Sequence, residues 1–67
     1  MKNNMKDLRA RFDFSQDVLA EKLRVSRQTI ISLEKGRYNP SSTQAFKLAR
    51  LFNCHIEDIF IYEEDNE

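Results

Sequence analysis

The side chains with the most distinctive hydrogen-bonding chemistry lie between residues 27 and 35. An arginine can bond guanine O6 and N7 together, and a glutamine can bond adenine N6 and N7 in the same two-pronged way. At about 100° per residue, a helix over this segment gathers five side chains on one face: Arg27, Gln28, Ile31, Ser32 and Lys35. Ile31 on such a face could contact a thymine methyl group, and an exposed isoleucine without a role is the alternative. The spacing predicts a helix face whose side chains have the chemistry to contact base edges.

The same sequence offers little for catalysis or metal binding. Cys54 is the one cysteine and His55 the one histidine, so neither an internal disulfide nor a metal site built on several histidines can form. No Ser/His/Asp set, paired carboxylates or phosphate-binding glycine loop is recognisable. We expect Cys54 to be a small core residue and His55 a surface or capping residue. We expect no enzyme, no metal, no cofactor and no small-molecule ligand.

The charges are distributed unevenly along a chain whose net charge is zero. Residues 22–50 hold seven basic residues and one acid, a net charge of +6, whereas residues 57–67 hold six acids and no Lys or Arg. A chain polarised in this way can present a strong local positive field while remaining neutral overall. The basic segment favours a nucleic-acid partner, and a solvated basic face without a partner is the alternative. We expect a single domain over residues 1–62 and an acidic tail over residues 63–67.

Apolar residues recur every three or four positions, which predicts a nearly all-helical chain. Ser15, Ser26 and Ser41 are natural N-caps, Gln44 completes a capping box with Ser41, and Gly36 is a natural helix end. Five helices are therefore expected, over residues 5–11, 16–23, 27–35, 42–52 and 56–59. The aromatic and β-branched residues 60–62 predict a short strand, whose free partner is the segment 1–3. The expected fold class is all-α, with five helices and a short two-stranded ribbon formed by the termini.

The second and third of these helices have the features of a helix-turn-helix unit. Two short helices joined by a three-residue turn cross closely in such a unit, and the second helix enters the major groove of DNA. Ala20 is small enough for the crossing point, Val25 can fill the turn, and Ile30 and Leu33 face the first helix. Three further apolar side chains are expected to point inward: Phe12, Val18 and Phe46.

The stretch from residue 15 to residue 40, SQDVLAEKLRVSRQTIISLEKGRYNP, resembles the Cro/CI-type (lambda-repressor-like, Xre) helix-turn-helix family. The similarity extends over residues 5–60 and is closest to short stand-alone members. It implies a five-helix lambda-repressor-like DNA-binding domain. The run SRQTI, followed by LEKGRYNP and an apolar helix ending near EDIF, is a much more specific signal than a helix-turn-helix pattern alone. The resemblance implies base readers at Arg27, Gln28 and Ser32.

The resemblance also implies which residues hold the DNA backbone and which brace the fold. Gln16 matches a phosphate-contacting glutamine at a helix N-terminus, where the partial positive charge favours anions. The phosphate contacts expected on these grounds are Gln16, Lys35, Arg37, Tyr38 and Asn39. Arg9 and Glu34 align with a structural ion pair between the first and third helices. Three positions depart from the family pattern: Arg24 replaces a glycine of the turn, Val18 an acidic residue, and His55 a capping Ser or Thr.

The function expected from these observations is a repressor that binds a palindromic operator as a homodimer. The apolar C-terminal end would form the dimer interface, through Phe52, Ile56, Ile59, Phe60, Ile61 and Tyr62. The alternative for Phe52, Ile59 and Phe60 is the core of their own protomer. An antitoxin or another protein-interaction module that keeps this fold, with an unknown protein partner, is the second hypothesis, and a monomeric architectural protein is the third.

The sequence also predicts the compartment in which such a protein works. No apolar run approaches the roughly 18–20 residues needed to cross a membrane, and the first residues lack the apolar stretch of a secretory signal. We therefore expect a cytoplasmic, nucleoid-associated protein whose partners are double-stranded DNA and a second copy of itself, with no membrane contact.

Overall fold

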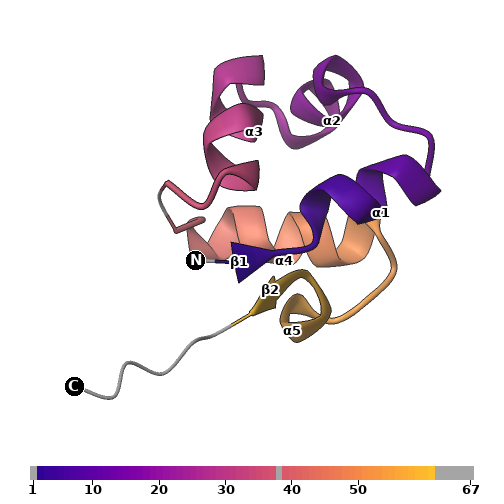
Figure 1. The fold of residues 1–67 in the computed structure, drawn as a ribbon, viewed down its shortest axis with the longest axis vertical. Helices are drawn as coiled ribbons and strands as arrows, with labels where there is room; N and C mark the ends of the chain where they lie inside the picture. Colours follow the sequence, from indigo (N-terminus) through magenta and orange to yellow (C-terminus); the bar gives the residue numbers. More distant parts are fainter. Residues whose placement is uncertain (1, 38, 62–67) are drawn as a thin grey trace.

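A computed structural model describes residues 2–37 and 39–61 of the chain. These residues form five helices and one two-stranded ribbon, whose strands are the first and last elements of the chain order (Figure 1). In chain order the elements are β1 (Lys2–Asn3), α1 (Met5–Arg11), α2 (Gln16–Leu23), α3 (Arg27–Glu34), α4 (Ser42–Leu51), α5 (Ile56–Ile59) and β2 (Phe60–Ile61). The all-α fold class with five helices and a terminal ribbon is confirmed.

Local side-chain hydrogen bonds explain where three of the helices begin. The hydroxyl of Ser15 accepts from the backbone N–H of Val18 at 3.1 Å, and that of Ser26 accepts from Thr29 at 3.2 Å. Ser41 accepts from the Gln44 N–H, and the Gln44 side chain accepts from the Ser41 N–H, both at 3.1 Å. Each serine satisfies a backbone donor that the helix itself leaves unpaired. The predicted caps, including the capping box, are confirmed.

Left-handed residues end the helices or follow them closely. Arg24, at the C-cap of α2, has φ 62°, and Asn53 has φ 54° just after α4. Gly36 has φ 71°, as predicted, and Asp13 has φ 60° in the turn after α1. Arg24 adopts this conformation where the family usually has glycine, so the turn retains its shape despite the steric cost of a Cβ atom.

One hydrophobic core joins all five helices and the second strand. Figure 1 shows α2 and α3 above, α1 and α4 across the middle, and α5 with the ribbon below. The fully buried side chains are Met5, Leu19, Ile30, Leu33, Leu48 and Ile59. Burial of these side chains is the main favourable contribution to folding, at roughly 1.5–3 kcal/mol for each Leu, Ile or Met side chain.

Several expectations about the helices are corrected in detail. α3 ends at Glu34 and α4 at Leu51, one residue earlier than predicted, because Lys35 and Phe52 are the C-caps. Three side chains expected inward are exposed: Phe12, Val18 and, at 62% exposure, Phe46. Each short helix buries a single stripe, and these three residues lie at its edge or beyond it. Phe12 keeps edge-on contact with Phe52, with ring centroids 5.3 Å apart.

The terminal ribbon connects the two ends of the chain and fixes them to α3. β1 and β2 pair antiparallel, with Lys2 opposite Ile61 and Asn3 opposite Phe60. The Asn3 side-chain amide donates to the Leu33 carbonyl oxygen at 2.8 Å. The predicted pairing of the termini is confirmed for these residues, and Met1 and Tyr62 lie outside the described residues. The ribbon therefore supports the last turn of α3.

The left-handed conformation of Arg24 gives a test of backbone strain. Arg24→Gly should raise the free energy of unfolding by about 1 kcal/mol, because glycine adopts positive φ without a Cβ clash. Urea unfolding followed by circular dichroism measures the change. Arg24→Ala removes the same charge but keeps the Cβ atom, so it should give no such gain. An equal gain in both variants would assign the effect to the lost charge instead.

Candidate nucleic-acid interface

The candidate site begins with the packing of α2 against α3. Ala20 is buried at their crossing, Val25 is half-buried in the turn, and the Val25 N–H donates to the Ala20 carbonyl at 3.0 Å. Ile30 and Leu33 are fully or almost fully buried on the inner side of α3. Because these contacts fix the rotation of α3 about its axis, they also determine which side chains it turns outward. The steric requirements predicted for the helix-turn-helix unit are met.

The outward face of α3 carries the predicted base readers. Arg27 and Gln28 are exposed, and Ile31 and Ser32 are half-buried. Within residues 2–37 and 39–61, the Gln28 side chain has no hydrogen-bond partner. Arg27 makes one loose ion pair, 3.7 Å from Nε to Asp17 Oδ1, with both side chains largely exposed. Exposed pairs of this kind contribute little to stability, so neither side chain is held by a strong contact within the described residues.

A hydrogen-bonded cluster around Glu34 fixes the C-terminal end of α3. Arg9 Nε donates to Glu34 Oε2 at 2.6 Å and Nη2 to Oε1 at 3.4 Å, so the predicted ion pair is confirmed. Arg9 Nη1 also donates to the Phe14 carbonyl at 3.1 Å. The exposed fractions of the two charged side chains are 16% and 8%. The cluster therefore joins α1 to α3 in a setting largely shielded from water.

Gln16 belongs to this cluster, which sequence reasoning did not anticipate. Its Nε2 donates to Glu34 Oε1 at 3.2 Å. A glutamine amide carries two N–H donors, so one can bond Glu34 while the other points to a phosphate. Gln16 is also the first residue of α2, where unpaired backbone N–H groups favour anions. The structure thus holds the side chain in place and leaves it a donor.

A shallow cavity of about 310 Å³ brings several of these residues together. Its lining residues are Lys6, Arg9, Gln16, Ile31, Glu34 and Lys35. One expected base reader, Ile31, therefore lies beside two expected phosphate contacts, Gln16 and Lys35. Lys6 was not predicted. Its position three residues before Arg9 on the same helix is the signal that could have indicated it, since residues three apart share a helix face.

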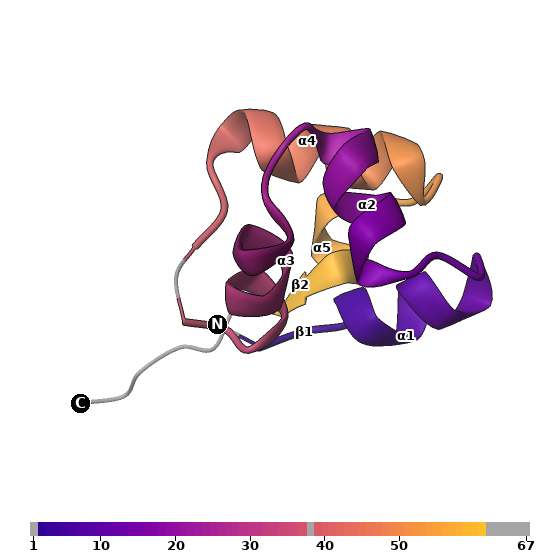
Figure 2. The same ribbon diagram turned by 90° about the horizontal axis from the view of Figure 1, so that it is seen from above.

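The loop after α3 carries the remaining expected phosphate contacts. Figure 2 shows this loop leaving the end of α3 and running to the start of α4. Arg37 and Asn39 are exposed in it, and the Arg37 N–H donates to the Ser32 carbonyl at 3.1 Å. Tyr38 lies outside the described residues. Arg37 and Lys35 therefore place two positive charges at the C-terminal end of α3.

The structure corrects half of the expected dimer interface. Phe52, Ile59 and Phe60 are 3%, 0% and 8% exposed in the core of their own protomer, so they do not face a partner. Ile61 is exposed and Ile56 half-buried, and Tyr62 lies outside the described residues. Helical periodicity in the sequence identified the apolar positions of α4 and α5. It did not show that the C-terminal end of the domain packs against α1. An apolar groove of about 520 Å³ remains there, lined by Asn39, Pro40, Ala45, Ile56, Glu57, Phe60 and Ile61.

Other chemistries find little support in the described residues. Across residues 2–37 and 39–61, no three His, Cys, Asp or Glu side chains gather as metal ligands. Burial raises the pKa of the half-buried Cys54 thiol above its usual value, and the nearby Asp58 carboxylate adds to this. The thiol is therefore protonated at neutral pH and is a poor nucleophile. Within the same residues, no helix is long and apolar enough to cross a membrane.

Comparison with known proteins identifies the family. A profile described as helix-turn-helix matches residues 5–59. The chain belongs to the Cro/CI-type helix-turn-helix family. An uncharacterised HTH-type transcriptional regulator of Methanocaldococcus jannaschii is 58% identical over 65 residues, which cover 97% of this chain and 98% of that protein.

Two further relatives come from an archaeon and a bacterium. An uncharacterised HTH-type transcriptional regulator of Archaeoglobus fulgidus is 51% identical over 65 residues, or 97% of this chain and 92% of that protein. One of Bacillus subtilis is 48% identical over 66 residues, or 98% of this chain and all of that protein. This helix-turn-helix protein is therefore a DNA-binding transcriptional regulator by family, and the family is not a class of enzymes.

The cluster at Glu34 gives a test of how firmly α3 is held. Glu34→Ala leaves the Arg9 guanidinium poorly solvated and unpaired, which should lower the free energy of unfolding by about 3 kcal/mol. The double variant Arg9→Met/Glu34→Leu should recover most of this loss, because two apolar groups need no partner. Urea unfolding of Arg9→Met, of Glu34→Leu and of the double variant completes a double-mutant cycle. Additive losses would show that the two side chains do not depend on each other.

Proposed function

We propose that this protein is a repressor that binds a palindromic operator as a homodimer, with α3 in the major groove. The observation that carries the proposal is the outward face of α3: among the described residues the Gln28 side chain has no hydrogen-bond partner, and the opposite face of the helix is buried in the core. A helix held in this way presents its side chains to base edges with little loss of conformational freedom on binding.

Base recognition is assigned to four residues of α3. Arg27 bonds guanine and Gln28 bonds adenine, in keeping with the hydrogen-bonding groups of each pair. Both residues lie at the N-terminal end of α3, the part of a recognition helix that contacts base edges in the major groove. Ser32 lies about one helical turn further along α3 and forms a hydrogen bond with either guanine or adenine. Ile31 packs against a thymine methyl group. Its half-buried position beside Lys35 and Gln16 supports this role over that of an isolated exposed isoleucine.

Phosphate contacts flank this helix and set its position without reading sequence. Gln16 contributes its second amide N–H together with the backbone donors at the start of α2. Lys35, Arg37 and Asn39 contact the backbone at the other end of α3, with Tyr38 added on the family resemblance. Lys6 lies beside Gln16 and Lys35 and joins this set. Such a regulator works where the DNA is, so we expect it in the cytoplasm, on the nucleoid.

A dimer contacts more base pairs than a single recognition helix and can therefore select its site more specifically. A single recognition helix contacts a few base pairs, too few to select one site in a genome. Two copies related by a two-fold axis double that number and require half-sites roughly 34 Å apart. The apolar groove beside Ile56 and Ile61 is the surface we assign to this contact, because Ile61 is a large apolar side chain left exposed at its edge.

Two variants separate base reading from backbone binding. Gln28→Ala should weaken operator binding by about 1–3 kcal/mol and relax the preference at one base pair in each half-site. Arg37→Ala should weaken operator and unrelated DNA about equally and reduce the salt dependence. Fluorescence anisotropy with operator and scrambled duplexes at two ionic strengths measures both. Intact specificity in Gln28→Ala would mean that α3 docks differently.

The dimer and the palindrome can be tested together. Selection of bound sequences from a random DNA pool should return an inverted repeat with half-sites about one helical turn apart. Ile61→Glu should give a monomer in sedimentation equilibrium and lose operator binding at concentrations where the native chain binds. Val18→Glu places the same charge on a similarly exposed apolar position of α2 and should remain dimeric. Single, unrepeated selected sites, or a dimeric Ile61→Glu, would contradict this arrangement.

A further inference from the structure

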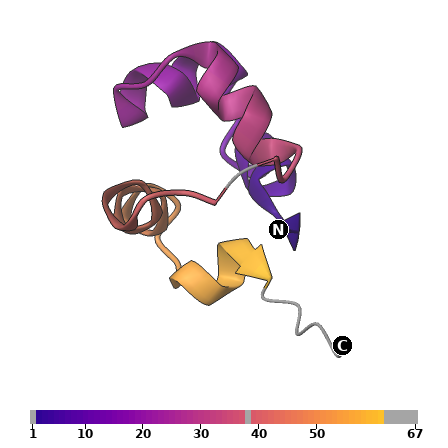
Figure 3. The same ribbon diagram turned by 90° about the vertical axis from the view of Figure 1, so that its left-hand side faces the viewer.

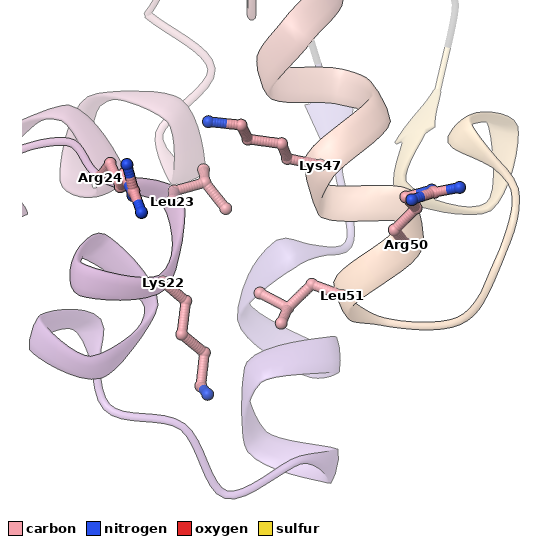
Figure 4. A pocket seen from close by; sticks show the side chains of 6 residues that line it. All are labelled: Lys22, Leu23, Arg24, Lys47, Arg50 and Leu51. Carbon is pink, nitrogen blue, oxygen red and sulfur yellow. The ribbon is translucent and has the colours of Figure 1, made fainter.

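A second cavity lies away from the proposed DNA interface and is lined by positive charge. It has a volume of about 470 Å³ and lies between the C-terminal end of α2 and the second half of α4 (Figure 4). We call it the cationic groove, and its lining residues are Lys22, Leu23, Arg24, Lys47, Arg50 and Leu51. In Figure 4, Lys47 and Leu51 extend from α4 toward α2, whereas the charged ends of Lys22 and Arg50 point away from the space between the two helices and lie at its rim. The groove thus combines four cations with two leucines.

The cations of this groove lack acidic partners. None of the six lining residues is an acid. Within residues 2–37 and 39–61, neither Arg24, Lys47 nor Arg50 forms an ion pair or a side-chain hydrogen bond. The Lys22 ammonium lies over the Phe14 ring, 5.2 Å from its centroid, and the side chain stays exposed. Four like charges gathered around one hollow repel each other and attract a ligand with several negative charges.

The groove is separate from the surface assigned to DNA. Gln16 begins α2, whereas Lys22, Leu23 and Arg24 end it, about 9–12 Å further along the helix at 1.5 Å per residue. None of the lining residues lies on α3. The contacts with DNA proposed above therefore do not include the four positive charges of the cationic groove.

The sequence itself contains an anion of matching charge. Tyr62 is followed by four acids among the last five residues: Glu63, Glu64, Asp65 and Glu67. An aromatic side chain next to a run of carboxylates complements a groove with an apolar floor and a cationic rim. We propose that the cationic groove binds the acidic C-terminal segment, residues 62–67, of a second copy of this protein.

The position of the chain end allows the segment to reach a second copy. In Figure 3, α2 and α4 lie on the left, and β2, where the described chain ends, lies below and to the right of α4. Six extended residues span at most about 20 Å. The molecule is 21–23 Å wide along its two shorter axes, and a path around it is longer than its width. A segment of this length is about as long as the molecule is wide, so it extends to a neighbouring copy at least as readily as around its own protomer.

This contact has consequences for how copies assemble. It joins the end of one copy to a different surface of the next, so it can either be exchanged reciprocally by two copies or continue from copy to copy. Exposed ion pairs are individually weak and are screened by salt. The contact therefore acts mainly between copies that DNA already holds side by side, where the effective concentration is high. Its result is cooperative occupancy of neighbouring sites.

The test uses a labelled peptide of residues 61–67 and the full chain, without DNA, so it does not depend on the proposed operator. Fluorescence anisotropy should show binding that weakens as salt rises from about 0.05 M to about 0.5 M. Lys47→Glu/Arg50→Glu should weaken it about tenfold or more. Lys2→Glu/Arg11→Glu changes the net charge equally at two exposed positions, on β1 and α1, and should bind the peptide normally. Circular dichroism checks that both variants are folded.

A charge exchange makes the test specific. A peptide carrying Glu63→Lys and Glu64→Lys should not bind the native chain but should bind Lys47→Glu/Arg50→Glu. Equal binding to both double variants, or no recovery in the exchange, would overturn the proposal. A duplex of unrelated sequence and inorganic polyphosphate serve as other polyanions. If Lys47→Glu/Arg50→Glu loses binding to either one but not to the native peptide, the groove is a phosphate site and the proposal fails.

Discussion

The Glu34 carboxylate accepts hydrogen bonds from Arg9 on α1 and from Gln16 on α2, and it belongs to the last residue of α3. Three helices therefore meet at one acidic group with little access to water. Removing charges from water is costly, and close, well-directed bonds must offset that cost. The apolar packing against α2 fixes the rotation of α3 about its axis, and these directional bonds in addition fix the position of its C-terminal end. The positions of the proposed base readers follow from both constraints.

The cluster around Glu34 also prevents the Glu34 carboxylate from repelling phosphates at the proposed interface. A lone carboxylate at the end of α3 would repel phosphates, because like charges a few ångströms apart interact strongly where water is scarce. The Arg9 guanidinium neutralises Glu34, and Lys6 and Lys35 line the same shallow cavity. Gln16 can then bond the acid and a phosphate at once. Fold stability and backbone contact therefore share one set of atoms.

The parts of the fold that could be predicted from sequence are those decided within a few residues. Serine caps, the left-handed Gly36 and Arg24, and the ends of α1, α2 and α5 depend on neighbours along the chain. The exposure of Phe46 and the burial of Phe52 depend on which elements meet in space. Helical periodicity predicts an apolar stripe, but it does not say what covers the stripe or where its edge lies. The Gln16 bond to Glu34 joins residues 18 positions apart and is inaccessible to local reasoning.

Charge separation gives a small neutral regulator two properties that would otherwise conflict. A net positive chain of this size would bind all DNA strongly, because phosphate contacts carry no sequence information. A neutral chain with evenly mixed charges would lack a local field to approach DNA at all. Concentrating +6 in residues 22–50 and the acids near the end places the positive charge on two parts of the surface, the end of α3 and the cationic groove. The acidic end then lowers nonspecific affinity, and the cationic groove gives that end a place to bind on a neighbouring copy.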